Sequence, residues 1–434
     1  MPSETNLGDI ALGEEMHGWV RDLFPICRSI TGSGVRKTLD YLTTILPDMR
    51  IRAVPSGTTA FDWTVPDEWN ISKAFIEDIE GNVLVDFRRN NLHVMGYSTP
   101  IDAWMTLDEL QPHLHSIPDR LDTIPYVTSY YSRNWGFCLT QRQRDALPRE
   151  GKLHVVIDST LQPGQLNYGE LILPGQEDRE IFFSTYVCHP SMANNELSGP
   201  VVCTALARWV RGLTQRRYTY RFIFIPETIG SIVYLSMHHE ELKRNVIAGF
   251  NLTCVGDDRA YSFLPSREGD TLADRVALQA LKTSGVDYKK YSFLTRGSDE
   301  RQYCWPGINL PIVSIMRSKY GTFPEYHTSD DDLSLVTPNG LAGALALHME
   351  CVKIVEADRI YVNKGMCEPN LGRRGLYPLI SSLEGKTFSR SLLDFLIYCD
   401  GNRSLLEIAE ILEKSLDEIL LIAETLRAHG LVEE

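Results

Sequence analysis

Two side chains of the types that bind metal ions stand seven positions apart in IFFSTYVCHPSMANNELSG, residues 181–199. His189 follows an apolar run typical of a buried strand, and Glu196 stands just before Ser198, where a helical pattern begins. An imidazole and a carboxylate at the mouth of a strand–loop–helix unit are ligand types of a hydrolytic zinc site. The remaining groups of such a site must come from other segments.

Acidic and histidine side chains also follow the later apolar runs. Glu227 follows TYRFIFIP, Asp257 follows VIAGFNLTCVG, and His327 lies in the loop after LPIVSIMR. Ligands of an open α/β sheet bind beyond the carboxyl ends of its strands, so we expect these groups to converge. Zinc hydrolases use three protein ligands and a water whose proton a nearby Glu accepts. We expect His189, Glu196 and His327 as ligands, Glu227 as the general base, and Asp257 as the alternative carboxylate ligand.

The elements that would position these residues alternate between strands and helices. Strand patterns cover residues 180–188, 219–227, 246–257 and 310–317, and helical patterns cover 198–213, 230–244, 271–285 and 339–359. A further helical region covers residues 8–50. This alternation predicts an α/β fold in which a mixed sheet is sandwiched by helices.

Two regions of the sequence do not follow this alternation of strands and helices. We expect residues 1–58 and 159–372 to form the α/β catalytic domain, and 59–158 an inserted β-rich lid domain. The aromatic residues of the insert, as in YVTSYYSRNWGF, would line a substrate cleft or fill its core. Residues 380–434 resemble a winged helix, with five Lys or Arg against eleven Asp or Glu, a net charge of −6. We expect this domain to serve packing or protein contacts, since phosphate would repel it.

Bulk properties exclude several classes of function. The net charge of −14 argues against a nucleic-acid partner. The sequence contains no stretch of about 18 apolar residues, so no membrane span is expected. The nine cysteines have no paired spacing, which is typical of reduced thiols, so we expect a cytoplasmic protein. The expected partner is a small peptide or an aminoacylated small molecule, and a homo-oligomer is compatible with the sequence.

Three blocks of residues together resemble a known family. CHPSMANNELSG, IPETIGS and EYHTSDDDL are similar to the motifs of the bacterial zinc aminopeptidase superfamily. The closest resemblance is to its aminopeptidase-like branch, which has an inserted β domain and a C-terminal winged-helix unit. The resemblance implies a phosphorylase/hydrolase-like fold and hydrolysis of an amide bond at a free amino terminus.

The chain departs from this family at the bridging carboxylate, at one carboxylate of the second metal and at one of the first. Two-zinc members carry Asp-Asp where this chain has Asn194-Asn195, Glu-Glu where it has Glu227-Thr228, and Asp where it has Thr253. An amide oxygen is a weak zinc ligand beside a carboxylate. We therefore expect one zinc ion per chain.

Alternatives remain for several of these residues. Glu196 would instead favour the positive N-terminus of the following helix. The resemblance places GSDERQYCW at the pocket wall, where Asp299 or Glu300 would hold a substrate ammonium and Arg301 a carboxylate. Tyr326 would donate a hydrogen bond to the oxyanion. The lost acidic ligands also fit a catalytically inactive relative that binds a peptide or an amino compound.

Overall fold

The computed structural model describes residues 7–377 and 383–434. Residues 380–382, with which the expected C-terminal domain begins, lie outside the described residues. The chain divides into two compact units, Met1–Asp274 with Val286–His348, and Arg275–Gly285 with Met349–Glu434. Within the described ranges, no helix is both long and apolar enough to cross a membrane.

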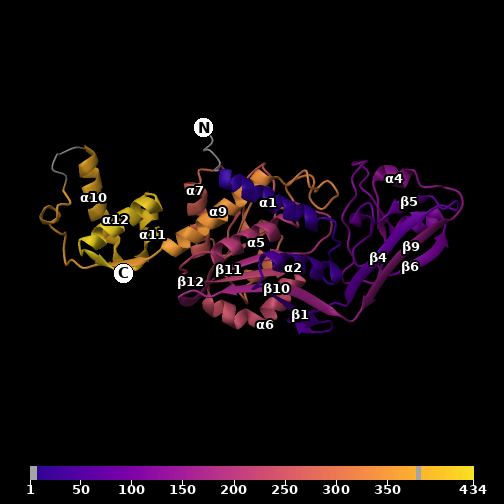
Figure 1. Ribbon diagram of the computed structural model, residues 1–434, viewed down its shortest axis with the longest axis horizontal. Helices are drawn as coiled ribbons and strands as arrows, with labels where there is room; N and C mark the ends of the chain where they lie inside the picture. Colours follow the sequence, from indigo (N-terminus) through magenta and orange to yellow (C-terminus); the bar gives the residue numbers. More distant parts are fainter. Residues whose placement is uncertain (1–6, 378–382) are drawn as a thin grey trace. The chain divides into compact units, whose positions relative to one another are not determined.

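The first unit is built on an eight-stranded mixed sheet, which confirms the expected fold class (Figure 1). Its strand order is β1-β10-β12-β11-β13-β16-β14-β15. The strands are β1 (Arg50–Pro55), β10 (Gln165–Leu173), β12 (Tyr218–Ile225), β11 (Glu177–Tyr186), β13 (Val246–Asn251), β16 (Ile312–Met316), β14 (Ser262–Leu264) and β15 (Lys289–Lys290). The four strands expected to carry the site, β11, β12, β13 and β16, are neighbours and run parallel.

Helices connect these parallel strands on both sides of the sheet. Helix α5 (Ser198–Arg211) joins β11 to β12 on one side, and α6 (Ile229–Asn245) leads from β12 back to β13 on the other. Because such crossovers are right-handed, steps in opposite directions place α5 and α6 on opposite faces (Figure 1). The helices α1 (Leu7–Leu23), α2 (Ser33–Ile45), α7 (Leu272–Thr283) and α9 (Pro338–Ala357) confirm the other helical predictions.

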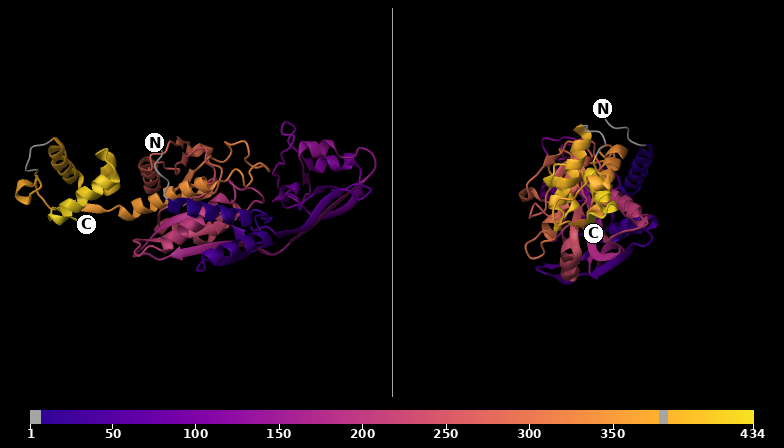
Figure 2. Two further views of the ribbon diagram at one scale, coloured as in Figure 1. Left: turned by 45° about the horizontal axis from the view of Figure 1, so that its top comes forward. Right: turned by 90° about the vertical axis from the view of Figure 1, so that its left-hand side faces the viewer.

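Between β1 and β10 the chain forms a separate antiparallel sheet in the order β5-β4-β9-β6. Its strands are β4 (Glu68–Glu77), β5 (Val83–Asp86), β6 (Ile101–Met105) and β9 (Leu153–Gln162), and the long pair β4 and β9 is visible in Figure 2. Two small pairs accompany it, β2 (Thr59–Ala60) with β3 (Trp63–Thr64), and β7 (Leu114–His115) with β8 (Phe137–Cys138). Short helices α3 (Leu107–Leu110) and α4 (Gln141–Asp145) begin at Thr106 and Thr140, which form capping boxes.

The second unit contains the expected C-terminal helices α10 (Leu383–Tyr398), α11 (Leu405–Ile411) and α12 (Leu416–Ala428). Capping boxes at Ser404 and Ser415 fix where α11 and α12 begin. A small sheet completes the winged helix, with β17 (Ile360–Asn363) between β18 (Asp400–Ser404) and β19 (Val432–Glu433).

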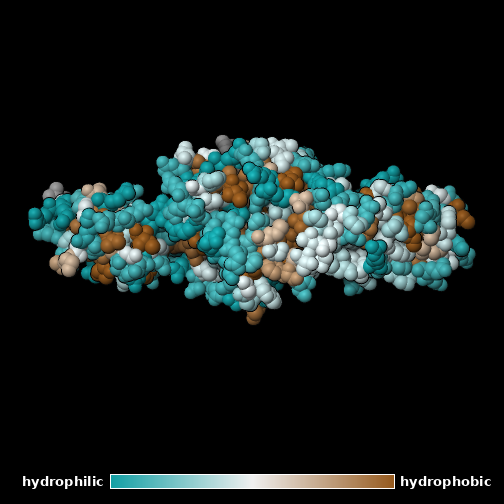
Figure 3. Space-filling view, turned by 90° about the horizontal axis from the view of Figure 1, so that it is seen from below, coloured by the Kyte–Doolittle hydropathy of each residue, from teal (hydrophilic) through white to brown (hydrophobic). Residues whose placement is uncertain are grey.

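On the face of the molecule in Figure 3, hydrophilic residues dominate and the apolar patches are separate from one another.

Candidate active site

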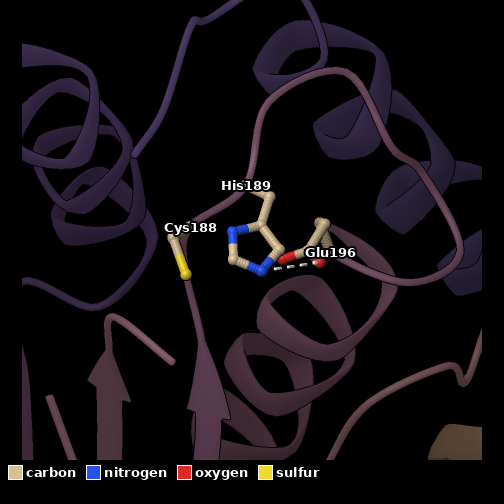
Figure 4. A group of neighbouring side chains, drawn as sticks. All are labelled: Cys188, His189 and Glu196. Carbon is tan, nitrogen blue, oxygen red and sulfur yellow. Dashed lines mark ion pairs between the residues drawn. The ribbon is translucent and has the colours of Figure 1, made fainter. Parts of the chain in front are cut away.

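His189 lies just beyond the end of β11 and is only 5% exposed. Its Nε2 lies 3.2 Å from Oε2 of Glu227 and 3.9 Å from Oε1 of Glu196. Figure 4 shows the imidazole and the Glu196 carboxylate facing one another. Burial, with a contribution from the positive charge of Arg28, lowers the pKa of His189 to about 3. The imidazole is therefore neutral near pH 7, which is the form that binds metals.

Two tyrosines hold the other nitrogen of this histidine. The hydroxyls of Tyr126 and Tyr130 lie 2.8 Å and 2.9 Å from Nδ1 of His189 and also hydrogen-bond to each other. Both belong to the segment between β7 and β9, so the inserted region supplies part of the site. A partner on one ring nitrogen orients the other one, here Nε2, toward the carboxylates. The sequence showed the tyrosine cluster but gave no sign that it reaches His189.

Glu196 is fully buried, and one of its oxygens has no protein partner. Oε1 accepts a hydrogen bond from the side-chain amide of Asn195, whereas Oε2 has no partner among the described residues. Burial, and then the negative charge of Glu227, raise the pKa of Glu196 well above its usual range. Helix α5 begins with Leu197 as its N-cap and no side-chain cap hydrogen bond, so the carboxylate does not cap that helix by a hydrogen bond.

Glu227 lies two residues after β12, opposite His189. Its carboxyl group is partly accessible, because the side chain is 18% exposed. Burial and the negative charge of Glu300 raise the pKa of Glu227, and the positive charge of Arg301 opposes that shift. Its backbone N–H donates to Sγ of Cys188 over 3.1 Å, and its Oε2 faces Nε2 of His189.

His327 approaches the same place from the loop after β16. Its ring centroid lies 5.9 Å from that of His189, and the two planes are nearly perpendicular. Its carbonyl oxygen accepts a hydrogen bond from the backbone N–H of Tyr126 over 3.0 Å. Burial lowers the pKa of His327 to about 3, with a further contribution from His189. This histidine is therefore also neutral near pH 7.

Cys188 lies in one group of possible ligand atoms with His189 and Glu196. One atom each of Cys188, His189 and Glu196 lies within 4.8 Å of the others, and Figure 4 shows the three side chains together. Metals bind the thiolate, but burial raises the pKa of Cys188 well above its usual range. The sulfur also already accepts the N–H of Glu227. The structure thus brings His189, Glu196 and Glu227 together, and the ring of His327 lies beside the ring of His189.

Asp257 lies outside this group, in a hydrogen-bond network that uses both of its oxygens. Oδ1 accepts from the hydroxyl of Ser318 and the N–H of Arg259, over 2.8 Å and 2.9 Å. Oδ2 accepts from the amide of Asn194 and the N–H of Ser318, each over 2.9 Å. Four donors leave this carboxylate little capacity for a metal, so the geometry favours Glu196 as the carboxylate ligand.

The four residues expected to contact substrate differ in how far their polar atoms are already engaged in hydrogen bonds. Glu300 is engaged through both oxygens, by Tyr320, Asn251 and the backbone N–H groups of the preceding loop. Oδ2 of Asp299 and Nε of Arg301 have no hydrogen-bond partner among the residues that the structure describes. Oδ1 of Asp299 accepts the backbone N–H of Thr228, and Nη2 of Arg301 donates to the Thr228 hydroxyl. The ring of Tyr326 stacks on His327 with the centroids 3.9 Å apart.

A buried aspartate links the loops that carry Glu196 and His327. Asp331 accepts hydrogen bonds from the N–H groups of Ala193, Asn194 and Asn195, over 3.2 Å, 2.6 Å and 2.9 Å. No local pattern indicates this role of Asp331, because its partners stand more than 130 positions away. Backbone strain collects at the same strand ends, where φ is positive at Ser191, Thr228, Cys254 and His327.

Comparisons with known proteins show the family of the chain and its fold. The family described as "Domain of unknown function (DUF4910)" matches residues 17–358, and one described as winged helix-turn-helix matches residues 359–434. A protein of Clostridium acetobutylicum, named "Putative polysaccharide biosynthesis protein with aminopeptidase-like domain", is 46% identical over 399 residues, 92% of this chain and 91% of that protein. A solved "putative peptidase" of the same species has 43% identity and a TM-score of 0.91, over 98% of this chain and 97% of that one.

More distant structures share the fold alone. BSAP, a zinc aminopeptidase from Bacillus subtilis, is 14% identical with a TM-score of 0.58, over 79% of this chain and 94% of that one. The resemblance inferred from the three motif blocks is thereby confirmed. The chain belongs to the family described as "Domain of unknown function (DUF4910)", carries a C-terminal winged helix-turn-helix, and has the fold of the bacterial zinc aminopeptidases.

Proposed function

We propose that this protein uses one zinc ion to hydrolyse an amide bond of a small peptide or an aminoacylated metabolite. The unpaired, fully buried Oε2 of Glu196, beside Nε2 of His189, is the observation that carries the proposal. A buried carboxylate oxygen without a donor is costly unless a cation binds it. His189, Glu196 and His327 would hold the zinc, as two neutral imidazoles and one carboxylate.

The chain's own groups supply the proton transfer. Bound zinc would acidify a water molecule and polarise the scissile carbonyl. Glu227 lies on the accessible side of His189 and accepts the proton of the attacking water, then delivers it to the leaving amine. Its raised pKa suits this exchange, because a group that titrates closer to neutral pH both takes up and releases a proton readily. Tyr126 and Tyr130 keep the His189 ring in place during these steps.

A second metal has few groups left to bind it. Oδ1 of Asn194 accepts the N–H groups of Gly256 and Asp257, over 2.9 Å and 3.2 Å, and its amide donates to Asp257. Thr253, at another position where the resemblance implies an acid in two-zinc members, hydrogen-bonds to the hydroxyl of Tyr186. These side chains are already satisfied by protein groups, which supports one metal per chain.

Metal analysis of the purified protein tests the proposal directly. We expect about one equivalent of zinc per chain and its loss in His189→Ala and His327→Ala. His238→Ala is the matched control, because this histidine lies on α6 beside Glu241. Less than half an equivalent of zinc, or retention of zinc in both variants, would overturn the metal assignment.

A panel of amides then tests the activity. The panel contains free peptides, aminoacyl amides and aminoacylated sugars, the last because a relative is named for polysaccharide biosynthesis. Zinc-dependent release of an amine from any member supports hydrolysis. If the zinc-loaded protein binds members of the panel but cleaves none, the lost second-metal ligands mark a catalytically inactive binding protein instead.

A further inference from the structure

Arg28 is a fully buried cation with two unsatisfied nitrogens. It lies in the loop between α1 and α2, where Nη1 donates to the carbonyl oxygens of Leu23 and Ile26 over 2.6 Å and 3.2 Å. Within the part of the chain that the structure describes, Nε and Nη2 have no hydrogen-bond partner. Buried guanidinium groups are normally paired with acids, because an uncompensated charge is expensive to bury.

The charge of Arg28 acts on the candidate active site. Burial lowers the pKa of Arg28 to about 10, and among the opposing influences the negative charge of Glu196 is the largest. The guanidinium in turn lowers the pKa values of His189 and Glu196. Yet no ion pair joins Arg28 to Glu196, whose Oε2 is itself unpaired. A cation and an anion thus lie close enough to interact while each keeps hydrogen-bonding capacity unused.

The cation also stands in a site that has lost acids. Asn194, Thr228 and Thr253 stand where the resemblance to the zinc aminopeptidases implies carboxylates in two-zinc members. With one zinc ion, Glu196 would face two fixed positive charges, those of the metal and Arg28. A free ammonium group of a substrate would be repelled beside Arg28, whereas an anionic group would supply the missing partner of Nε and Nη2.

We propose that Arg28 binds an anionic group of the substrate, a carboxylate or a phosphate, next to the amide bond that reacts. The inference rests on the proposed hydrolysis and narrows its substrates to acidic amides. A guanidinium with its Nε and Nη2 edge free matches two oxygens of either anion. Arg28 is therefore the residue that sets the preference for such substrates.

Anion binding tests this inference without catalysis. The zinc-loaded protein is titrated with acetate, methyl phosphate and neutral acetamide at constant ionic strength, and its melting temperature is followed. We expect the better-fitting anion to stabilise the wild type and acetamide to have no effect. Arg28→Met should abolish the anion effect, and Arg28→Lys should reduce it. Lys37→Met, which removes an exposed cation from α2, is the control and should respond as the wild type does.

Hydrolysis then tests the substrate preference with matched amides that differ only in a carboxylate, a phosphate or a carboxamide. We expect a higher kcat/KM, by about tenfold to a hundredfold, for one anionic amide, carried mainly by KM. Arg28→Met should bring the ratio close to one, and if that variant does not fold, Arg28→Lys should lower it by about tenfold. Equal use of charged and neutral amides, or a preference lost in Arg301→Met but kept in the Arg28 variants, would overturn the inference.

The two proposals fail in different ways. If the protein hydrolyses neutral amides as well as acidic ones, the hydrolase stands and the role of Arg28 is refuted. If no amide is hydrolysed, the hydrolase fails, and the melting experiment still decides whether Arg28 binds an anion. An anion effect of the same size in wild type and Arg28→Met refutes the role of Arg28 in either case.

Discussion

At the scale of single residues, the acids of the site differ in whether their carboxylate oxygens already accept hydrogen bonds. Asp257 and Glu300 are acids near strand ends, but their oxygens already accept enough donors to make them structural. Among the described residues, Glu196 and Asp299 each keep one oxygen without a hydrogen-bond partner, and Glu196 is the one that faces His189. Residue type alone did not separate these carboxylates, whereas their hydrogen-bond partners do.

Replacement of Glu227 by Gln should separate catalysis from metal binding. The amide keeps the size of the side chain but cannot accept the proton of the attacking water, so kcat should fall by about 10²- to 10⁴-fold. Zinc content should stay as in the wild type, because Glu227 is not one of the three ligands. An unchanged kcat, or a loss of zinc that parallels the loss of activity, would contradict the assigned role.

The two tyrosines on His189 should act together. Either hydroxyl suffices to hold Nδ1, so Tyr126→Phe and Tyr130→Phe alone should change zinc affinity little. The double variant removes both partners, and the zinc dissociation constant should rise by about tenfold to a hundredfold. Tyr131→Phe, which alters an exposed neighbour, is the control for a competitive chelator titration. Equal affinities of the double variant and the control would argue against orientation of His189 by these tyrosines.

At the scale of elements, the sequence predicted the frame better than the contacts between its parts. Strands β11, β12, β13 and β16 are covered on both faces and therefore read as continuous apolar runs. Their carboxyl ends were correctly expected to meet. The contacts of Tyr126 with His189 and of Asp331 with Asn194 join positions 63 and 137 apart, respectively. Such contacts depend on loop geometry, which no local pattern encodes.

Asp331 should position the Glu196 loop rather than take part in the reaction. Asp331→Asn keeps the shape but replaces one acceptor oxygen by a donor facing backbone N–H groups. We expect a loss of about 2 kcal/mol in unfolding free energy and weaker zinc retention. Asp332→Asn is the matched control, since Asp332 bonds only its own loop at Ser334. The assignment fails if both variants bind zinc and melt alike.

His154 should make the inserted sheet sensitive to pH. Its two ring nitrogens lie 2.8 Å from Glu77 on β4 and 2.7 Å from Asp102 on β6, and these partners raise its pKa in the folded protein. A raised folded-state pKa means that this stabilisation is complete below the unfolded value of about 6.5 and is lost as the pH rises through the folded value. The protection factors of amides in β4, β6 and β9, which correct for the intrinsic rise of exchange with pH, should therefore fall over that interval, and His154→Gln should remove the effect. A pH dependence retained in the variant would assign it to other groups.

At the scale of the whole chain, each unit has its own chemistry. The first unit contains every residue of the candidate active site, together with the tyrosines that the inserted segment contributes. The second contains a winged helix-turn-helix, a fold often associated with DNA. The sequence predicted both, and it also predicted that charge would set this winged helix apart from those that read DNA.

The winged helix should not bind nucleic acid. The exposed positions of α12 are Asp417, Glu418, Leu421, Glu424, Arg427 and Ala428, so acids outnumber bases where a recognition helix would meet phosphate. Residues 381–434 carry five Lys or Arg against eleven Asp or Glu. DNA binding requires cations that release counterions from the phosphates, and this surface repels the duplex instead.

We expect no gel shift of a mixed-sequence duplex at low salt, where electrostatic attraction is strongest. Reversal of Asp417, Glu418 and Glu424 to Lys would bring the net charge of this segment from −6 to 0 and should produce salt-sensitive binding, which shows that the assay detects it. A salt-sensitive shift by the wild-type protein would refute the prediction and show that this domain binds nucleic acid.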